Sequence, residues 1–459
     1  MSINDEYLMT AVSTNDQAQA PLTNTARIRF LDALRGLALL GILLMNIMGA
    51  VQSNVFYRNM NLQQPVTGLN YYAWVIAMVT CEGAMRGLFS VLFGAGSLLL
   101  LDRIEKGNHA VAAADIYYRR VIWLMAFGVF DAFVLLWWGD ILFFYGLIGM
   151  FLFPFRKMSV RWLLIPIVVL LVFGVYHQSN KIIEKKAIIE KGVQADVLQS
   201  KKVKLSATQA TELTNYHTFR QENSSKGMMQ KAMQETATMQ QADAGGIIEA
   251  RQTRAVYMES VFLYDNWFDV LLFFFVGMIL YRSGFLSGES HVAIYVLTAV
   301  IGVTAGVWYN YINASYIYAV KFDEVIVIQH RPAADLLQVR RIFQVVGYIG
   351  LLALLYKLSA FRRVFNVLAP AGQLAFTNYL VQSVFMLLTA INFYGRLQRY
   401  EIFGLALGFY AFQVIFSHIW LRYFLFGPCE WLWRSLTYLK RPSFRKLKPA
   451  PQLSAIQAA

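Results

Sequence analysis

Ten apolar stretches, most of them about as long as a membrane is thick, run through this chain of 459 residues. A hydrocarbon core of about 30 Å needs roughly 20 residues of helix to cross it. Backbone amides in lipid must be bonded within their own segment, so such stretches fold as helices. The stretches are 30–51, 70–101, 117–138, 140–155, 161–178, 261–281, 291–313, 335–357, 366–390 and 401–422. They predict an all-α polytopic membrane protein with about ten transmembrane helices.

The positive charges predict how this protein lies in the lipid bilayer. With the N-terminus in the cytoplasm, the cytoplasmic segments and their edges hold 20 Lys and Arg residues, and the short outer loops hold at most 7. Positive charge favours the cytoplasmic side, so both termini are predicted there. The net charge is +14, and the Lys and Arg residues flank the helices rather than forming one basic face. This placement argues against nucleic acid as a partner.

The same pattern divides the chain into five parts. We predict a disordered cytoplasmic tail over 1–29, membrane helices over 30–178 and 261–422, and a basic cytoplasmic tail over 423–459. Between the two sets of helices, residues 179–260 carry 12 Lys and Arg and 9 Asp and Glu residues. Because helix formers dominate this segment, we predict that it is a polar, helical, extracytoplasmic insert.

Several ionisable residues interrupt the apolar stretches, where a charge costs roughly 2.5–3.5 kcal/mol and is a functional hypothesis by default. Asp32 and Arg35 are three residues apart and share a helix face. Glu82 and Arg86, four residues apart, are predicted to do the same. The six groups are Asp32, Arg35, Glu82, Arg86, Asp131 and Asp140. Their presence on consecutive helices predicts one polar cavity, and Asn46 lies on a similar side of the first helix near the outer leaflet.

Five of these six groups also have a purely structural interpretation. Asp32 and Arg35 would form an ion pair at the membrane interface, and Glu82 with Arg86 would lock helix packing. Asp140 would bind the free amides at the start of a helix. The histidines and the two cysteines show no metal-ligand spacing, so no metal site is predicted.

Four runs of sequence resemble the YeiB family of bacterial inner-membrane proteins, whose function is unknown. They are LDALRGLALLGILLMN (31–46), RGLFSVLFGAG (86–96) with GDILFFYG (139–146), GQLAFTNYLVQS (372–383) and GPCEWLWRSLT (427–437). The runs follow the family's order, although Arg86 stands where many members have Lys and Gln373 where Arg is common. The resemblance implies a multi-pass protein of the bacterial inner membrane.

The first run also resembles the opening helix of transmembrane acyltransferases, among them lysosomal glucosaminide N-acetyltransferases and surface-polysaccharide O-acyltransferases. Those enzymes pass an acyl group from cytoplasmic acyl-CoA to an acceptor, often across the membrane. The resemblance implies that 30–178 is the acyltransferase-like part, with Asp32 and Arg35 near the acyl-donor entrance. Asn46 stands where the polysaccharide enzymes have His, and an Asn side chain does not act as a general base.

The leading hypothesis is an acyltransferase with a small-molecule or glycan acceptor, no permanently bound cofactor, and acyl-CoA as co-substrate. Its predicted catalytic residues are Asp140 and Glu82, whereas Arg35 and Asp32 bind the CoA. The predicted substrate-binding residues are Asn46, Arg86, Asp131, Tyr145, Asn378 and Gln382. The alternatives are a carrier that uses the buried charges for a small polar or amphiphilic solute and for protons, and a membrane assembly factor. The oligomeric state is left open.

Overall fold

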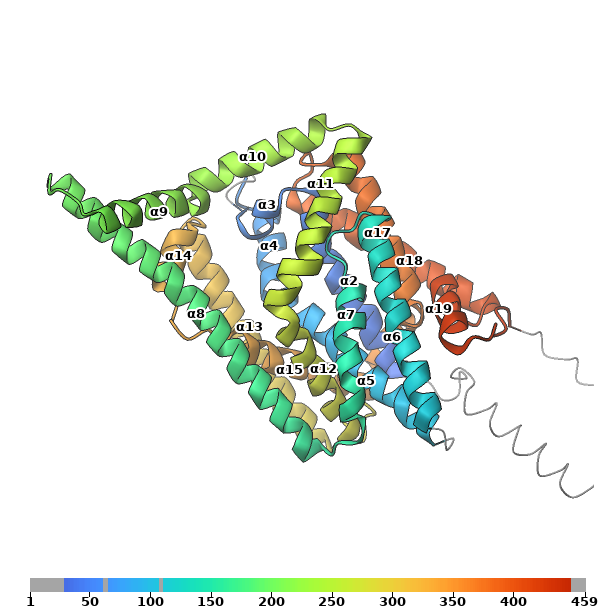
Figure 1. Cartoon of the computed structure of the whole chain (residues 1–459). Coiled ribbons are helices and arrows are strands. Elements are labelled where there is room, and N and C mark those ends of the chain that lie inside the picture. Colours follow the sequence, from blue (N-terminus) through green and yellow to red (C-terminus); the bar gives the residue numbers. More distant parts are fainter. Residues whose placement is uncertain (1–28, 61–64, 107–109, 447–459) are drawn as a thin grey trace, which may run out of the picture.

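The computed structural model describes residues 29–60, 65–106 and 110–446, and every regular element among them is helical apart from one isolated bridge between Phe424 and Arg445. Figure 1 shows long helices packed side by side, with a helical arm across one end of the bundle. Eight helical segments of the described chain are long and apolar enough to cross a membrane. The protein is therefore an all-helical membrane protein, as the sequence predicts.

The helices fall into three consecutive groups. The first contains α2 (Arg29–Val51), α3 (Asn54–Arg58), α4 (Leu69–Ile76), the π-helix η3 (Ala77–Cys81), α5 (Ala84–Glu105), α6 (Ala110–Phe133), α7 (Leu142–Gly149) and the 3-10 helix η4 (Met150–Lys157). The second contains α8 (Val160–Ser200), α9 (Ala207–Asn223), α10 (Ser225–Gln241), α11 (Ala244–Tyr257) and the π-helix η5 (Met258–Phe262). The third contains α12 (Leu263–Arg282), α13 (Val292–Ala319), α14 (Glu324–His330), α15 (Leu337–Lys357), α16 (Ser359–Gln373), α17 (Ala375–Phe393), α18 (Arg399–Tyr423) and α19 (Pro428–Tyr438).

Eight of the ten predicted crossings correspond to the long apolar segments, and the two others do not. The helix α6 is 24 residues long, but it carries the charged residues Asp115, Arg119, Arg120 and Asp131. The helices α7 and η4 have only eight residues each. The predicted stretch 117–138 also extends too far, because α6 ends at Phe133 and a loop follows it.

Two of the predicted crossings are interrupted in the structure. The stretch 70–101 is helical to Cys81 and restarts at Ala84, because Gly83 has a φ of +70°, which L side chains rarely adopt. The stretch 366–390 contains the end of α16 and most of α17, which meet at Leu374. Only α17 is long and apolar enough to cross the membrane, so the predicted boundaries are wrong there.

The predicted insert folds as helices that leave and re-enter the bundle at the same end. The helix α8 has 41 residues, about 62 Å at 1.5 Å per residue, so it extends beyond a hydrocarbon core of about 30 Å. The helices α9 and α10 lie across the bundle, and α11 leads back into α12 (Figure 1). Ser53, just after α2, donates a hydrogen bond of 2.6 Å to Glu235 of α10. The insert thus covers the end opposite Arg29, and we name these the insert end and the Arg29 end.

The helix α19 lies at the Arg29 end, against α6 and α17. Its Glu430 accepts hydrogen bonds from the backbone amides of Phe376 and Thr377, at the start of α17. Gly372, just before α17, touches the Asp32 backbone, because a Cβ there would lie 1.7 Å from the Asp32 carbonyl oxygen. The start of α2 and the helix α19 therefore lie at the same end of the bundle, opposite the insert.

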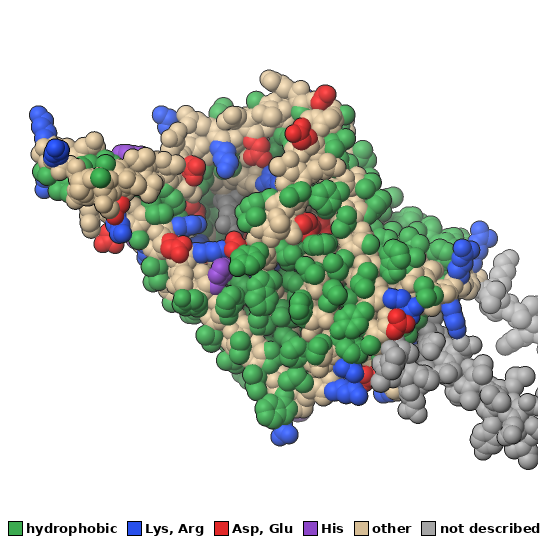
Figure 2. All heavy atoms as spheres, in the orientation of Figure 1, with side chains coloured by type: hydrophobic (Ala, Val, Ile, Leu, Met, Phe, Trp, Pro, Cys, Tyr) green, Lys and Arg blue, Asp and Glu red, His purple; other side chains and the backbone are tan. Residues whose placement is uncertain are grey.

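The surface is that of a protein surrounded by lipid. Figure 2 shows a broad hydrophobic area over α8, α12 and α7, with charged side chains gathered toward the two ends. The exposed apolar residues of α8 include Val168, Val169 and Val172. Apolar faces of this extent require an apolar partner, which the bilayer supplies. That the Arg29 end faces the cytoplasm stays a prediction, and 1–28 and 447–459 of the predicted tails lie outside the described residues.

Candidate functional site

Asp32 and Arg35 form the ion pair that their spacing predicts. Arg35 donates to Asp32 Oδ1 at 2.8 Å, with Asp32 buried and Arg35 partly exposed. The backbone of α16 lies against this turn of α2 through Gly372. Arg35 also faces Gly96 of α5 and lies within electrostatic range of Arg120. The arrangement places a partly exposed guanidinium at the Arg29 end, where the acyl-donor entrance is predicted.

The helix break at Gly83 separates Glu82 from Arg86. Glu82 ends the π-helix η3 with a ψ of 121°, whereas Arg86 belongs to the first turn of α5. Glu82 lies within electrostatic range of Arg340, and Arg86 pairs with a different carboxylate. The prediction that Glu82 and Arg86 share one helix face is therefore wrong, because it assumed an unbroken helix.

Side chains of α13 and α15 bind backbone carbonyls at the break and just before it. Asn310 and Gln344 donate to the Val79 carbonyl at 3.0 and 3.2 Å. Arg341 donates to the Gly83 carbonyl through Nε at 3.2 Å and Nη2 at 2.9 Å. Irregular backbone at membrane depth is tolerated only where protein groups or water satisfy it. The polar side chains of α13 and α15 fulfil that requirement here.

Arg86, Asp269 and Arg341 form a group that we call the ion cluster, in which Asp269 and Arg341 are buried and Arg86 is partly exposed. Asp269 accepts from Arg86 through Oδ2 at 2.7 Å and from Arg341 through Oδ1 at 2.5 Å. Arg341 also donates to Gln338 Oε1 at 3.0 Å. These bonds link α5, α12 and α15. Asp269 and Arg341 were missed by the sequence analysis, although Asp269 interrupts the apolar stretch 261–281 just as Asp131 interrupts its own.

Tyr145, a predicted substrate-binding residue, connects α7 to α5. Its hydroxyl lies 2.7 Å from Ser90 Oγ and donates to the Arg86 carbonyl at 3.3 Å. The side chain is buried, and its ring packs against Phe93 and Phe274. These contacts are those of a helix-packing residue, and its role in substrate binding stays a prediction.

Asp131 of α6 and Asp140 before α7, both buried, lie within electrostatic range of the half-buried Glu259 of η5, and we call these three the carboxylate cluster. Asp131 is 0% exposed, and within the described residues neither of its carboxylate oxygens makes a hydrogen bond. Asp140, Glu259 and the Ser383 hydroxyl are its polar neighbours. The Glu259 oxygens also lack a hydrogen-bond partner in the described chain. Nowhere in the described ranges do three His, Cys, Asp or Glu side chains converge as metal ligands.

Asp140 binds the start of α7, as its structural interpretation predicts. Its Oδ2 accepts from the Phe143 amide at 2.8 Å, and its Oδ1 lies 3.4 Å from the Tyr379 hydroxyl. That hydroxyl in turn accepts from the Ile141 amide at 3.1 Å. A Cβ on Gly128 would lie 2.5 Å from Asp140 Oδ2, so a glycine is needed for α6 to pass this close. Asp140 is held in one orientation beside a carboxylate that has no such bonds.

Asn378 and Gln382 bind the neighbouring helix α18. Asn378 donates to Ser417 Oγ at 3.1 Å, and Gln382 donates to Gln413 Oε1 at 2.9 Å. Gln413 donates back to the Asn378 carbonyl at 2.8 Å. Hydrogen bonds of this kind hold membrane helices together. These contacts explain why the residues are buried, and their predicted role in substrate binding is not tested by them.

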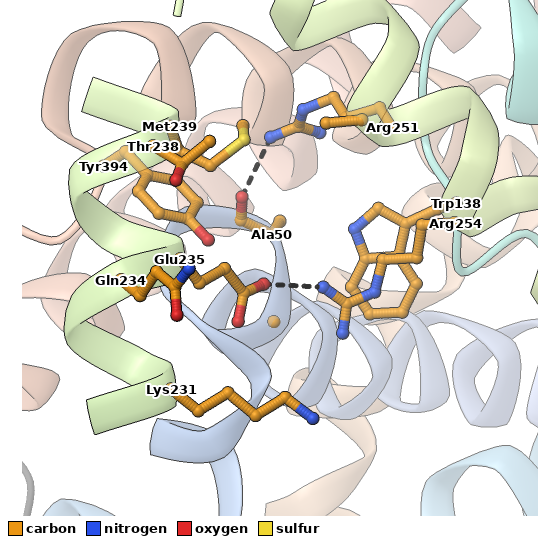
Figure 3. Close-up of a pocket in the computed structure, with 12 residues that line it drawn as sticks. Ala50, Trp138, Lys231, Gln234, Glu235, Thr238, Met239, Arg251, Arg254 and Tyr394 are labelled. Carbon is orange, nitrogen blue, oxygen red and sulfur yellow. Dashed lines mark hydrogen bonds and ion pairs between the residues drawn. The ribbon is translucent and has the colours of Figure 1, made fainter. Parts of the chain in front are cut away.

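A cavity of about 340 Å³ opens at the insert end, between α10, α11, the end of α2 and the loop before α7 (Figure 3). Arg254 and Trp138 lie on one side, with Glu235 of α10 and Tyr394 opposite. None of the ten predicted site residues lines this cavity. Asn46 is half-buried one helical turn before the α2 residues that do. The basic lining was missed because it belongs to the insert, whose return onto α2 is a tertiary contact.

The loop between α6 and α7 connects the cavity to the carboxylate cluster. Trp138 lines the cavity, and Asp140 of the cluster follows two residues later. Arg251 of α11 donates to the Leu136 carbonyl at 3.2 Å and to the Ala50 carbonyl at 2.9 Å. These bonds fix the loop to the end of α2, so the position of the cavity relative to Asp140 is set by the protein backbone.

The six predicted ionisable groups therefore fall into separate places. Asp131 and Asp140 lie together near the insert end, whereas the pair Asp32–Arg35 lies at the Arg29 end. Arg86 belongs to the ion cluster. α2, α5 and α6 present these groups to different neighbours, and a cavity shared by all of them stays a prediction.

Comparison with known proteins places the chain in a family. Residues 280–440 match the family described as "Protein of unknown function (DUF418)". The chain is 30% identical over 466 residues to the uncharacterized protein YxaH of Bacillus subtilis (strain 168), covering 94% of this chain and 99% of the relative. It is 27% identical over 428 residues to the uncharacterized protein YeiB of Escherichia coli (strain K12), covering 89% and 95%. No solved structure matches the chain. The protein belongs to the YeiB-like DUF418 family of membrane proteins of unknown function.

Proposed function

We propose that this chain is a transmembrane acyltransferase of the bacterial inner membrane. It takes an acyl group from cytoplasmic acyl-CoA and passes it to an acceptor in the cavity at the insert end. The observation that carries the proposal is Asp131, a wholly buried carboxylate whose polar neighbours in the described chain are Asp140, Glu259 and the Ser383 hydroxyl, with no cation among them. It faces Asp140, which lies two residues from a side chain that lines the cavity.

The carboxylate cluster has the chemistry that acyl transfer needs. A general base removes the proton of the acceptor hydroxyl, whose oxygen attacks the thioester carbonyl carbon. The carbon–sulfur bond then breaks, and the leaving CoA thiolate takes up the proton. Two carboxylates that face each other in a dry site repel when both are charged, so the pair favours holding one proton between them. Asp131 and Asp140 would thus supply both a proton acceptor and a proton donor.

The Arg29 end has groups that suit the acyl donor. Arg35 is partly exposed there, within electrostatic range of Arg120, whose guanidinium stacks on the Trp433 ring at 3.8 Å. Arginine is the side chain best matched to the bidentate recognition of phosphate. The 14 residues from Arg35 to the cavity wall at Gly49 correspond to about 21 Å along α2. Donor and acceptor would therefore enter from opposite ends of the bundle.

Acetyl-CoA binding tests the donor half of the proposal. Calorimetry of the purified full chain should show binding of acetyl-CoA. The substitution Arg35→Lys should weaken this binding about tenfold, because lysine keeps the charge but cannot make the bidentate hydrogen bonds to phosphate. Arg363→Lys is the matched control, since Arg363 is exposed on α16, near the same end. No heat and no thermal shift at millimolar acetyl-CoA would overturn the proposal, and so would equal effects of the two variants.

Transport is a second candidate, and the interrupted helix α4–η3–α5 favours it. Discontinuous helices are a recurring part of transporters, in which their ends face the solute. Here the break lies next to Arg86 of the ion cluster, and the carboxylate cluster would carry the protons. A carrier would not bind acetyl-CoA, and reconstituted protein would show uptake that depends on a pH gradient.

A further inference from the structure

The cavity at the insert end is built jointly by the insert and the membrane helices. Its lining residues are Gly49, Ala50, Trp138, Lys231, Gln234, Glu235, Thr238, Met239, Ala250, Arg251, Arg254 and Tyr394. Figure 3 shows side chains of α10 on one side and those of α11 on the other, converging on the space between them. A Cβ on Gly49 would lie 3.1 Å from the Trp138 ring, so the indole packs directly on α2. The cavity is a defined feature of the fold.

The charges around this cavity do not balance. Lys231, Arg251 and Arg254 line it, and Glu235 is its single carboxylate. Glu235 is already bonded on both oxygens: Oε1 accepts from Arg254 at 3.1 Å, and Oε2 accepts from Ser53 at 2.6 Å. Three cations against one anion leave a formal charge of +2 on the lining.

Each cation is held differently, and one remains available. Arg251 is buried and donates to two backbone carbonyls, which carry no formal charge. The Arg254 guanidinium stacks on the Trp138 ring at 4.1 Å while it pairs with Glu235. Lys231 is exposed and extends toward the cavity below Glu235 (Figure 3). A ligand would therefore meet one free ammonium next to two positioned guanidinium groups.

A smaller cavity continues the same basic surface. It has a volume of about 80 Å³ and shares Met239, Arg251 and Tyr394 with the larger one. Arg396 lines it and adds a fourth cation. The shared methionine and tyrosine supply an apolar wall beside the charged groups. The combined site suits a ligand that has a small anionic group and an uncharged body.

We propose that this site binds the phosphate group of the acyl acceptor. Phosphate is recognised by Arg in a bidentate manner and by Lys as a point charge. Two sources of this chemistry can reach the insert end, a soluble sugar or polyol phosphate and the phosphate of a lipid headgroup. Calling the ligand the acceptor rests on the proposed acyl transfer, whereas the binding itself does not.

The test uses glycerol 3-phosphate as the probe and glycerol as its uncharged counterpart. Purified full-length protein in detergent should bind the phosphate and not glycerol, as measured by calorimetry. Lys231→Gln should weaken this binding about tenfold, because one charged contact to the phosphate is lost. Lys226→Gln is the control, because Lys226 is exposed on the same helix but does not line either cavity. Arg254→Gln should weaken binding further if the variant folds.

Lipid nanodiscs distinguish the two sources of phosphate. In discs of phosphatidylglycerol, a lipid headgroup in the site should compete and raise the apparent Kd of glycerol 3-phosphate relative to discs of phosphatidylcholine. Equal Kd values in both discs assign the site to a soluble phosphate. Equal binding of glycerol and glycerol 3-phosphate, or equal effects of Lys231→Gln and Lys226→Gln, would overturn the site. Phosphate binding without any acyl transfer would leave the site in place and refute the proposed function.

Discussion

The ion cluster and the carboxylate cluster lie in the same membrane bundle, and they differ in how their charges are compensated. In the ion cluster, Asp269 accepts from two arginines on two other helices, at 2.7 and 2.5 Å. In the carboxylate cluster, three acids share one region, and neither oxygen of Asp131 has a hydrogen bond within the described chain. The first cluster joins opposite charges, whereas the second gathers groups of the same sign.

The difference separates a structural role from a chemical one. A buried charge is costly unless it is paired and hydrogen-bonded, and the ion cluster meets that condition while it ties α5, α12 and α15 together. The carboxylate cluster does not meet it. Ionisable groups that stay unpaired inside a membrane protein mark proton or substrate paths by default. The two clusters should therefore respond in opposite ways when a carboxylate is replaced by its amide.

The largest expected effect is on stability, at Asp269. The substitution Asp269→Asn removes the only charge that compensates Arg86 and Arg341 in their cluster, so it should lower the free energy of unfolding by about 3 kcal/mol. This is the lower end of the usual range, because the Arg86 side chain is 34% exposed. Equilibrium unfolding in mixed micelles measures the change.

Asp265→Asn is the matched control for this variant. Asp265 lies one turn earlier on α12 and pairs with Lys181 at 2.9 Å, but its side chain is 34% exposed. Partly exposed ion pairs contribute about 1 kcal/mol or less. A loss at Asp265 as large as the loss at Asp269 would show that the ion cluster has no special structural role.

The second prediction concerns activity, at Asp131. The substitution Asp131→Asn keeps the volume, and the new amide can donate to Asp140 in place of the proton that the two carboxylates share. Stability should stay unchanged or rise by about 1 kcal/mol. Acyl transfer should fall at least about 100-fold, because a general base contributes roughly that much or more. Thiol release from acetyl-CoA measures the rate, and a variant with normal turnover would remove Asp131 from the mechanism.

Much of the fold could be predicted from the sequence, because apolar length follows directly from the thickness of the bilayer. The stretches 30–51 and 401–422 were located to within two residues of α2 and α18. The pair Asp32–Arg35 was also correct, since it depends only on the geometry of one unbroken helix. The interruption at Gly83 was missed. Its left-handed backbone is held by carbonyl contacts from a helix more than 200 residues later.

The candidate site was predictable only in part, for the same reason. Asp131 and Asp140 were found because a charge in an apolar stretch is visible in the sequence. Asp269 gives the same signal, because it also interrupts an apolar stretch. Arg254 could not be found this way, because its place in the cavity depends on the insert folding back over α2. Contacts within one helix can be predicted from the spacing of residues in the sequence, whereas contacts between helices far apart in the sequence cannot.

The smallest expected effect is at Glu82, which the sequence predicts as a catalytic residue and the structure places apart from the carboxylate cluster. Glu82 is half-buried at the end of η3, within electrostatic range of Arg340. The substitution Glu82→Gln removes one side of a partly exposed interaction, so it should cost less than about 1 kcal/mol of stability. Thiol release from acetyl-CoA should remain close to that of the unchanged protein. If Glu82→Gln abolishes turnover while Asp131→Asn does not, the proton transfer occurs at the helix break and not at the carboxylate cluster.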